Sequence, residues 1–115
     1  HALAFARANA LNNGCPDLEI IRLDWNSPDL KGPFDTILGS EVVYHERHFD
    51  ALSGLFEKFL KPGGEVILAS EMRKPSLEFV NKNQESYQLK ARRKVLRSMD
   101  TEIPVILCRM TPKNR

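Results

Sequence analysis

Amphipathic and apolar segments alternate along the chain and divide it into helices and strands. The clearest helical pattern runs from about residue 48 to residue 60, where apolar side chains recur at intervals of three and four: Phe49, Leu52, Leu55, Phe56, Phe59 and Leu60. Short apolar runs at 34–44 and 65–70 flank this helix. They predict two parallel strands joined by a crossover helix, with Lys61-Pro62-Gly63-Gly64 as the structural turn between helix and strand.

The beginning of the chain predicts a helix followed by a strand. Residues 1–13 are rich in alanine, which favours a helix with a narrow face suited to close packing on a sheet. Gly14 supplies a left-handed stop, and Pro16 prevents the helix from continuing. Residues 18–25 carry a run of apolar side chains and predict the first strand.

The end of the chain predicts a further helix and a hairpin. The helix begins with Ser76 as its N-cap and fades near Glu85. Residues 87–97 are ambiguous between strand and helix, and residues 103–110 read as a strand. With a short polar connection between them, these last two segments predict an antiparallel hairpin.

Composition and charge narrow the class of protein. The chain has 115 residues, of which 42% are hydrophobic and 28% charged, as is ordinary for one small globular domain. A net charge of +2 does not by itself argue for nucleic acid or anionic membrane, and no apolar run is long enough to span a bilayer. Cys15 and Cys108 lack the Cys-x-x-Cys spacing of a zinc site. They leave a disulfide open but favour a reduced, cytoplasmic chain.

The stretch Phe34–Tyr44 carries the main candidate chemistry. Its apolar middle predicts a buried interior strand, and Gly39-Ser40 then leaves room for close approach to the backbone. Ligands of open α/β sheets bind beyond the carboxyl ends of the strands, where Glu41 and Tyr44 follow. A carboxylate beside an aromatic ring suits a cationic amine that must lose a proton before it reacts. The alternative is an exposed loop glutamate with a tyrosine that covers the edge of the core.

Two further pairs of residues invite a functional reading. Asp24-Trp25 closes the first predicted strand and could border a purine, or be only a polar strand end with one packed aromatic ring. His45 and His48 have the spacing of a one-turn metal pair, but no third ligand is evident. Surface histidines near a helix start account better for this second pair.

A basic cluster lies in the ambiguous segment near the end of the chain. Its members are Lys90, Arg92, Arg93, Lys94 and Arg97. The cluster could contact RNA or an acidic partner, although it lacks interleaved aromatic residues. A solvated face of one strand or helix explains it equally well.

Taken in order, these segments resemble the class I S-adenosylmethionine-dependent methyltransferases, and more narrowly their protein-lysine branch, methyltransferase family 16. The resemblance rests on ALAFARANALNNG, LDW at 23–25, FDTILGSEVVYHERHF at 34–49, LKPGGEVILAS at 60–70 and the terminal hairpin. Glu41-x-x-Tyr44 matches the [DE]-x-x-[YF] pattern of this branch. The resemblance implies an α/β fold, a Rossmann-like sheet with an antiparallel C-terminal hairpin, in a single domain over residues 1–115.

The resemblance also implies a cofactor and roles for individual residues. Asp24 and Trp25 would border the adenine of S-adenosylmethionine, and Gly39-Ser40 would lie under its methionine portion. Glu41 and Tyr44 would be the catalytic pair that faces the incoming amine. Catalysis would be mostly positioning of a neutral amine for direct methyl transfer, with no metal.

The resemblance also implies a class of substrate and further elements of the family that should precede this chain. Methyltransferases of base or amide nitrogens usually carry an Asn-Pro-Pro-Tyr type motif where this chain has Gly-Ser-Glu-Val-Val-Tyr. A lysine amine of a protein substrate is therefore favoured, while RNA, a small-molecule amine and a non-catalytic methyltransferase-like interaction module stay open. The family's first strand, glycine-rich cofactor loop and acidic ribose-binding residue are expected to precede His1, or a partner chain to complete the sheet by strand addition.

Overall fold

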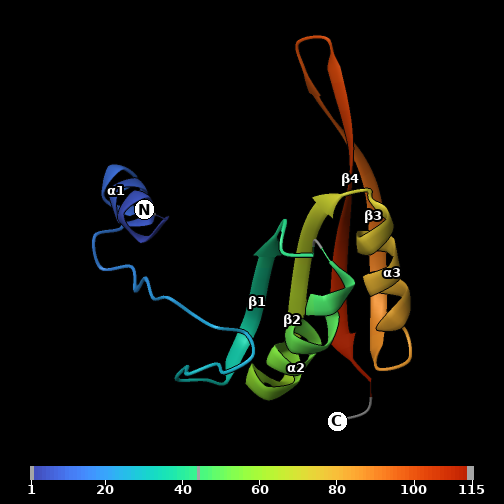
Figure 1. Ribbon diagram of the computed structural model, residues 1–115, viewed down its shortest axis with the longest axis horizontal. Helices are drawn as coiled ribbons and strands as arrows, with labels where there is room; N and C mark the ends of the chain where they lie inside the picture. Colours follow the sequence, from blue (N-terminus) through green and yellow to red (C-terminus); the bar gives the residue numbers. More distant parts are fainter. Residues whose placement is uncertain (1, 44, 114–115) are drawn as a thin grey trace.

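A computed structural model of the chain describes residues 2–43 and 45–113. Figure 1 shows a twisted sheet with two helices against one face, and an N-terminal helix that lies apart from it. The elements are α1 (Ala2–Asn12), β1 (Phe34–Ser40), η1 (Glu46–His48), α2 (Phe49–Phe59), β2 (Leu60–Glu71), α3 (Lys74–Lys82), β3 (Tyr87–Ser98) and β4 (Thr101–Pro112).

The sheet has four strands in the order β1-β2-β4-β3. β1 and β2 are parallel and joined through α2, so the predicted crossover is confirmed. β3 and β4 pair antiparallel from Tyr87–Pro112 to Ser98–Thr101, which confirms the predicted hairpin and resolves residues 87–97 as strand. The predicted α/β fold with an antiparallel C-terminal hairpin is therefore confirmed.

The hydrophobic core lies between the sheet and the two helices α2 and α3. The apolar face of α2 supplies five of the buried core residues, because its residues at intervals of three and four point to the sheet. Phe79 of α3 is fully buried, and its ring meets Phe49 edge to face with ring centroids 5.2 Å apart. Val66 of β2 and Met110 of β4 are buried on the sheet side of the core.

The N-cap of helix α3 lies three residues earlier than the sequence predicts. Its N-cap is Arg73 in extended conformation, and Pro75 occupies the first turn, where a missing backbone N–H costs nothing. Ser76 was wrongly predicted as the N-cap. Its hydroxyl instead donates to the carbonyl of Glu71 at 2.8 Å and is buried inside the helix.

The prediction that β1 is a buried interior strand is wrong. β1 pairs with β2 on one side only, so it is an edge of the sheet. Leu38 has 73% of its surface exposed, because helices cover only the opposite face within the described part of the chain. The strand forms as predicted, but its burial needs neighbours that this chain does not supply.

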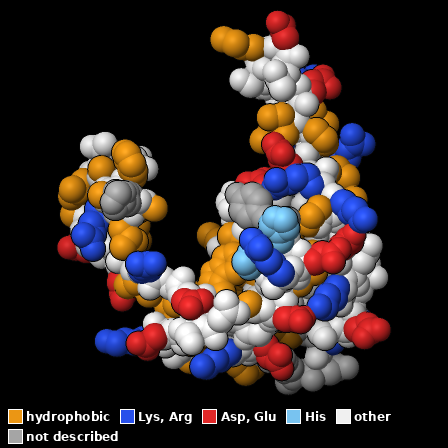
Figure 2. All heavy atoms as spheres, viewed as in Figure 1, with side chains coloured by type: hydrophobic (Ala, Val, Ile, Leu, Met, Phe, Trp, Pro, Cys, Tyr) orange, Lys and Arg blue, Asp and Glu red, His pale blue; other side chains and the backbone are white. Residues whose placement is uncertain are grey.

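Residues 2–33 depart furthest from the predicted structure. The predicted first strand at 18–25 is wrong: these residues form turns and irregular backbone with no paired strand beside them. Helix α1 is confirmed, but it buries no residue and does not pack on the sheet. Figure 2 shows its hydrophobic side chains spread over its surface, so alanine content alone does not bring the helix to the sheet.

Both cysteines have free thiols in the structure, and the expected reduced state stays a prediction. Cys15 is exposed, whereas Cys108 is buried in β4. Burial raises the pKa of the Cys108 thiol, because the charged thiolate loses its hydration. None of the helices described is both long and apolar enough to cross a lipid bilayer.

Candidate functional site

A hollow of about 300 Å³ lies beyond the carboxyl end of β1. It is lined by residues from two distant segments and from the start of the crossover: Leu23, Asp24, Trp25, Asn26, Val42 and His48. A ligand is predicted at this position, because ligands of open α/β sheets bind beyond the carboxyl ends of the strands. The structure therefore brings the predicted Asp24-Trp25 pair next to the segment that follows β1.

The Asp24-Trp25 pair is held by a turn rather than by a strand. One carboxylate oxygen of Asp24 accepts a hydrogen bond from the backbone N–H of Asn26 at 2.9 Å, and the Asp24 carbonyl accepts from Ser27 at 3.1 Å. The Asp24 side chain is otherwise exposed. The Trp25 ring is half-buried against the core and meets His48 edge to face at 6.0 Å. The hollow thus has one aromatic wall and one acidic rim.

Glu41 connects the ends of β1 and β2. Its backbone is left-handed, with φ of 54°, and its N–H donates to the carbonyl of Ala69 at 2.8 Å. One carboxylate oxygen accepts from the backbone N–H of Glu71 at 2.6 Å, and the other forms an ion pair with Arg73. Both oxygens of this predicted catalytic carboxylate are therefore engaged within the protein.

Position 39 requires glycine, because neighbouring side chains leave no room for a Cβ atom. A Cβ atom at this position would come within 2.8 Å of Leu68 and 2.9 Å of Val42. Ser40 is exposed at the end of β1. Neither residue lines the hollow, and neither does Glu41. Tyr44 lies outside the described residues, and the predicted roles of all four stay predictions.

Two residues of the candidate site, His48 and Arg73, were not predicted from the sequence. His48 was weighed only as one half of a metal pair with His45, whose ring centroid is 6.5 Å away. Its place at the start of α2, just after the candidate stretch, was the available signal. Arg73 gave no signal, because it is 32 positions from Glu41 in the sequence and is brought to it by the pairing of β1 with β2.

Residues 5–92 match the sequence profile described as lysine methyltransferase. The chain belongs to the lysine methyltransferase family. The family is the one that the motifs predict. The matched range includes the Asp24-Trp25 pair, Glu41 and the complete crossover, but not the end of the hairpin.

Solved structures show the same fold at low sequence identity. Precorrin-6y C5,15-methyltransferase from Geobacter metallireducens matches with a TM-score of 0.73 and 12% identity, over 96% of this chain and 62% of that one. An rRNA methylase from Streptococcus thermophilus gives 0.63 and 15%, over 96% and 68%. TrmN from Thermus thermophilus gives 0.64 and 22%, over 94% and 33%. This member of the lysine methyltransferase family therefore spans less than two thirds of the first of these relatives.

A search of curated protein sequences found no significant match. The family profile and the shared fold are consequently the two comparisons that bear on the site.

Proposed function

We propose that the protein transfers a methyl group from S-adenosylmethionine to a lysine amine of a protein substrate. The observation that carries the proposal is the family match, which extends over both segments that line the hollow beyond β1. Ligands of open α/β sheets bind at this end of the strands. The proposal is that the hollow is the adenine end of the cofactor site.

The residues around the hollow fit an adenine. The half-buried Trp25 ring offers an apolar wall for a flat heterocycle. Asp24 accepts hydrogen bonds from the backbone and the side chain of Asn26 through one carboxylate oxygen, and its other oxygen leaves acceptor capacity for an exocyclic amine. When bound, S-adenosylmethionine supplies an electrophilic methyl group on its sulfonium. The work of the protein is then to position the amine and to exclude water.

Glu41 and Tyr44 are proposed to face the incoming amine. Glu41 is held beside the end of β1 by Glu71 and Arg73, so its carboxylate is fixed in place. A substrate ammonium would have to share this carboxylate with Arg73. Such a shared carboxylate would orient the amine, which would have to give its proton to solvent before its lone pair could accept a methyl group.

Other methyl acceptors are the competing readings. The similar structures include an rRNA methylase and a precorrin methyltransferase, so the fold itself accommodates several substrate classes. The stretch Gly39–Tyr44 stands where base and amide methyltransferases usually carry an Asn-Pro-Pro-Tyr type motif. This replacement supports an aliphatic amine over a nucleobase. A partner chain or a further segment of the protein is proposed to complete the sheet beside β1.

The test uses the full-length protein with methyl-labelled S-adenosylmethionine and a protein extract. We expect label in macromolecules that protease removes and RNase does not. The double variant Glu41→Ala, Tyr44→Phe should lose most of this transfer, whereas Lys58→Gln on the exposed side of α2 should keep it. Label that RNase alone removes would establish RNA as the substrate.

Cofactor binding is tested separately by tryptophan fluorescence. The described chain has a single tryptophan, Trp25, at the wall of the hollow. Titration with S-adenosylhomocysteine should change an emission component that the Trp25→Phe variant lacks. An identical response in both proteins would remove Trp25 from the cofactor site, and no heat of binding by calorimetry would favour the non-catalytic module.

A further inference from the structure

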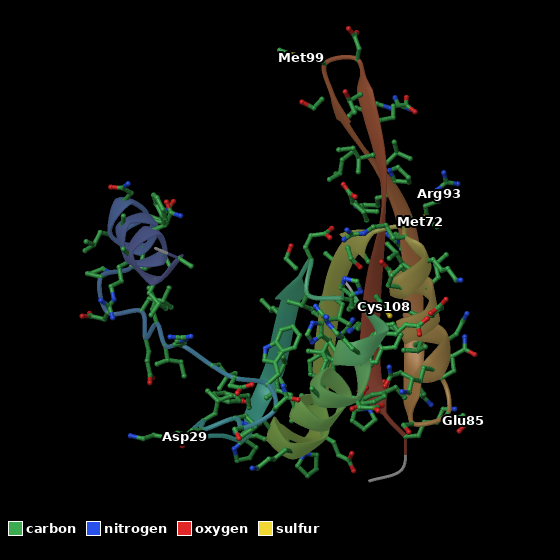
Figure 3. The ribbon with its side chains drawn as sticks, viewed as in Figure 1. Asp29, Met72, Glu85, Arg93, Met99 and Cys108 are labelled. Carbon is green, nitrogen blue, oxygen red and sulfur yellow. The ribbon has the colours of Figure 1, made fainter. Side chains whose placement is uncertain are left out.

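Strand β3 is an open edge of the sheet. It pairs with β4 on one side, and within residues 2–43 and 45–113 no strand pairs with its other side. Figure 1 shows that the β3–β4 hairpin extends well beyond the other strands, and Figure 3 shows Arg93 and Met99 along this projecting part. From Lys90 to Glu102 every residue is exposed. The hairpin therefore offers a long strand edge to solvent.

The register shows which backbone groups of β3 point outward. Val95 lies opposite Pro104, which has no N–H and whose carbonyl accepts from Met72 at 3.0 Å on the other side of β4. Val95 and Pro104 are therefore a non-hydrogen-bonded pair. Because such pairs alternate with hydrogen-bonded pairs, the odd-numbered residues from Ala91 to Arg97 direct their backbone N–H and C=O groups away from β4.

Three cations lie on one face of this edge strand. Lys90, Arg92 and Lys94 alternate along β3, so they share a face and recur every ~6.8 Å. None of the three has an ion-pair partner among the residues that the structure describes. Arg97, by contrast, pairs with Glu102 at 3.2 Å. The positive charge of the other three is thus uncompensated within the described chain.

The same face carries an apolar strip next to the cations. Arg92 lies opposite Leu107, and Leu107 lies opposite Ala69 of β2, on the face that α2 and α3 do not cover. A hollow of about 390 Å³ borders this strip, with Ile67 and Leu107 among its apolar residues and the three cations among its polar ones. No aromatic side chain lines it, so it offers no stacking platform for the bases of single-stranded RNA.

We propose that the β3 edge binds an extended acidic segment of a partner protein by strand addition. The outward N–H and C=O groups of the odd-numbered residues pair with the backbone of the segment. Acidic side chains at alternate positions of the segment have the same repeat as Lys90, Arg92 and Lys94, and they face these cations. This assignment rests on the proposed function, in which the substrate is a protein. The acidic segment is then a part of that substrate protein separate from the lysine that is methylated.

Peptide binding to the full-length protein, without cofactor, tests the charge part of the proposal. The probe is a fluorescent seven-residue threonine peptide with glutamate at alternate positions, and the reference has glutamine there. Fluorescence anisotropy should give at least about tenfold tighter binding for the glutamate peptide, since three ion pairs contribute. The triple variant Lys90→Gln, Arg92→Gln, Lys94→Gln should lose this difference. The matched variant Lys31→Gln, Lys58→Gln, Lys74→Gln removes equal charge elsewhere and should keep it.

A backbone variant tests the strand addition itself. Ala91→Pro removes one outward N–H while it keeps every charge, and an edge strand tolerates proline at such a position. It should weaken the glutamate peptide at least about fivefold, as one bond of the new ladder is lost. Ala91→Val keeps the N–H and should bind like the wild type. The melting temperature of each variant reports whether the hairpin is intact.

Three results would overturn the proposal: equal affinity for the two peptides, unchanged binding by a folded Ala91→Pro variant, or tighter binding of an oligouridylate than of the glutamate peptide. Charged residues that only protect the edge from aggregation would give the first of these. The measurements involve no methyl transfer. A protein that binds the peptide but transfers no methyl group would therefore refute the proposed function and leave this surface established.

Discussion

Residues 34–43 and 45–113 carry sequence patterns that predict helices and strands, and so do residues 2–33, but only the first group contains buried core residues. Every buried residue of the core lies between Val43 and Met110, and none of residues 2–33 is buried. Helix α1 forms with its own hydrogen bonds, yet Phe5 is 73% exposed and Leu11 is also exposed. The comparison shows that a local pattern predicts an element, whereas burial depends on a neighbouring surface that accepts it.

The difference has a physical reason. Helix α2 has a continuous apolar face and is tied to the sheet at both ends by short connections. Helix α1 has alanine at every second position and no continuous apolar face, and irregular backbone follows it up to β1. An isolated helix of this length is marginal in water. Amide hydrogen exchange should therefore be fast throughout α1 and slow in α2 and β2.

The largest test compares one aromatic residue from each region. Phe79→Ala removes a ring that is fully buried in the core and should cost about 3–5 kcal/mol of the free energy of unfolding. Phe5→Ala, on exposed α1, should change it by less than about 0.5 kcal/mol. Denaturant unfolding monitored by circular dichroism measures both. Similar costs for the two variants would mean that α1 is packed in solution.

A second test compares two glycines within the ordered region. Gly39→Ala places a methyl group within 2.8 Å of Leu68 and should destabilise the protein by about 1–3 kcal/mol. Gly54 lies in α2 with nothing within 4 Å of its added Cβ, so Gly54→Ala should stabilise by about 0.5–1 kcal/mol. In thermal unfolding, Gly39→Ala should lower the melting temperature and Gly54→Ala should raise it. A harmless Gly39→Ala would show that the end of β1 is loosely packed.

These contrasts also show what the sequence could predict. The crossover of α2 and the hairpin follow from apolar periodicity and turn residues, both of which are local. The edge position of β1 depends on how many strands lie beside it, and no local pattern reports this. The role predicted for Asp24 and Trp25 stays a prediction, and their position next to Val42 and His48 depends on the tertiary structure. The ion pair of Glu41 and Arg73 is equally tertiary.

A third test concerns the bonds between β1 and β2. Glu41→Ala leaves the Glu71 N–H and the Arg73 guanidinium without this carboxylate and should cost about 1–2 kcal/mol. Glu41→Asn should cost less, because asparagine tolerates the left-handed backbone and keeps an acceptor. Asp24→Ala removes only a local turn bond at an exposed site and should cost less than about 0.5 kcal/mol. Equal melting temperatures for the two Glu41 variants would show that the bonds of Glu41 with Glu71 and Arg73 do not stabilise the protein.

The smallest effect is a pH dependence within the ordered region. A hydrogen bond with the Glu46 side chain raises the pKa of Glu78, with smaller contributions from desolvation and from the charge of Glu46. Between the ordinary and the raised pKa, the folded state binds more protons than the unfolded state. Its stability therefore decreases as the pH rises through this window.

Glu46→Gln removes the repulsion between the two carboxylates. It should raise the melting temperature relative to the wild type more at pH 7 than at pH 4, measured by differential scanning fluorimetry. Asp100→Asn, in the exposed turn between β3 and β4, removes an equal charge away from Glu78 and serves as the control. An advantage of Glu46→Gln that is larger at pH 4 would reverse the assigned sign.

The central claim is methyl transfer to a protein lysine. Its most direct measurement is acid hydrolysis of the macromolecules labelled by the full-length protein, followed by chromatography of the labelled products. We expect the label to co-elute with methylated lysine and to be absent when Glu41→Ala and Tyr44→Phe are combined. Label in methylated nucleosides, or in an amino acid other than lysine, would contradict it.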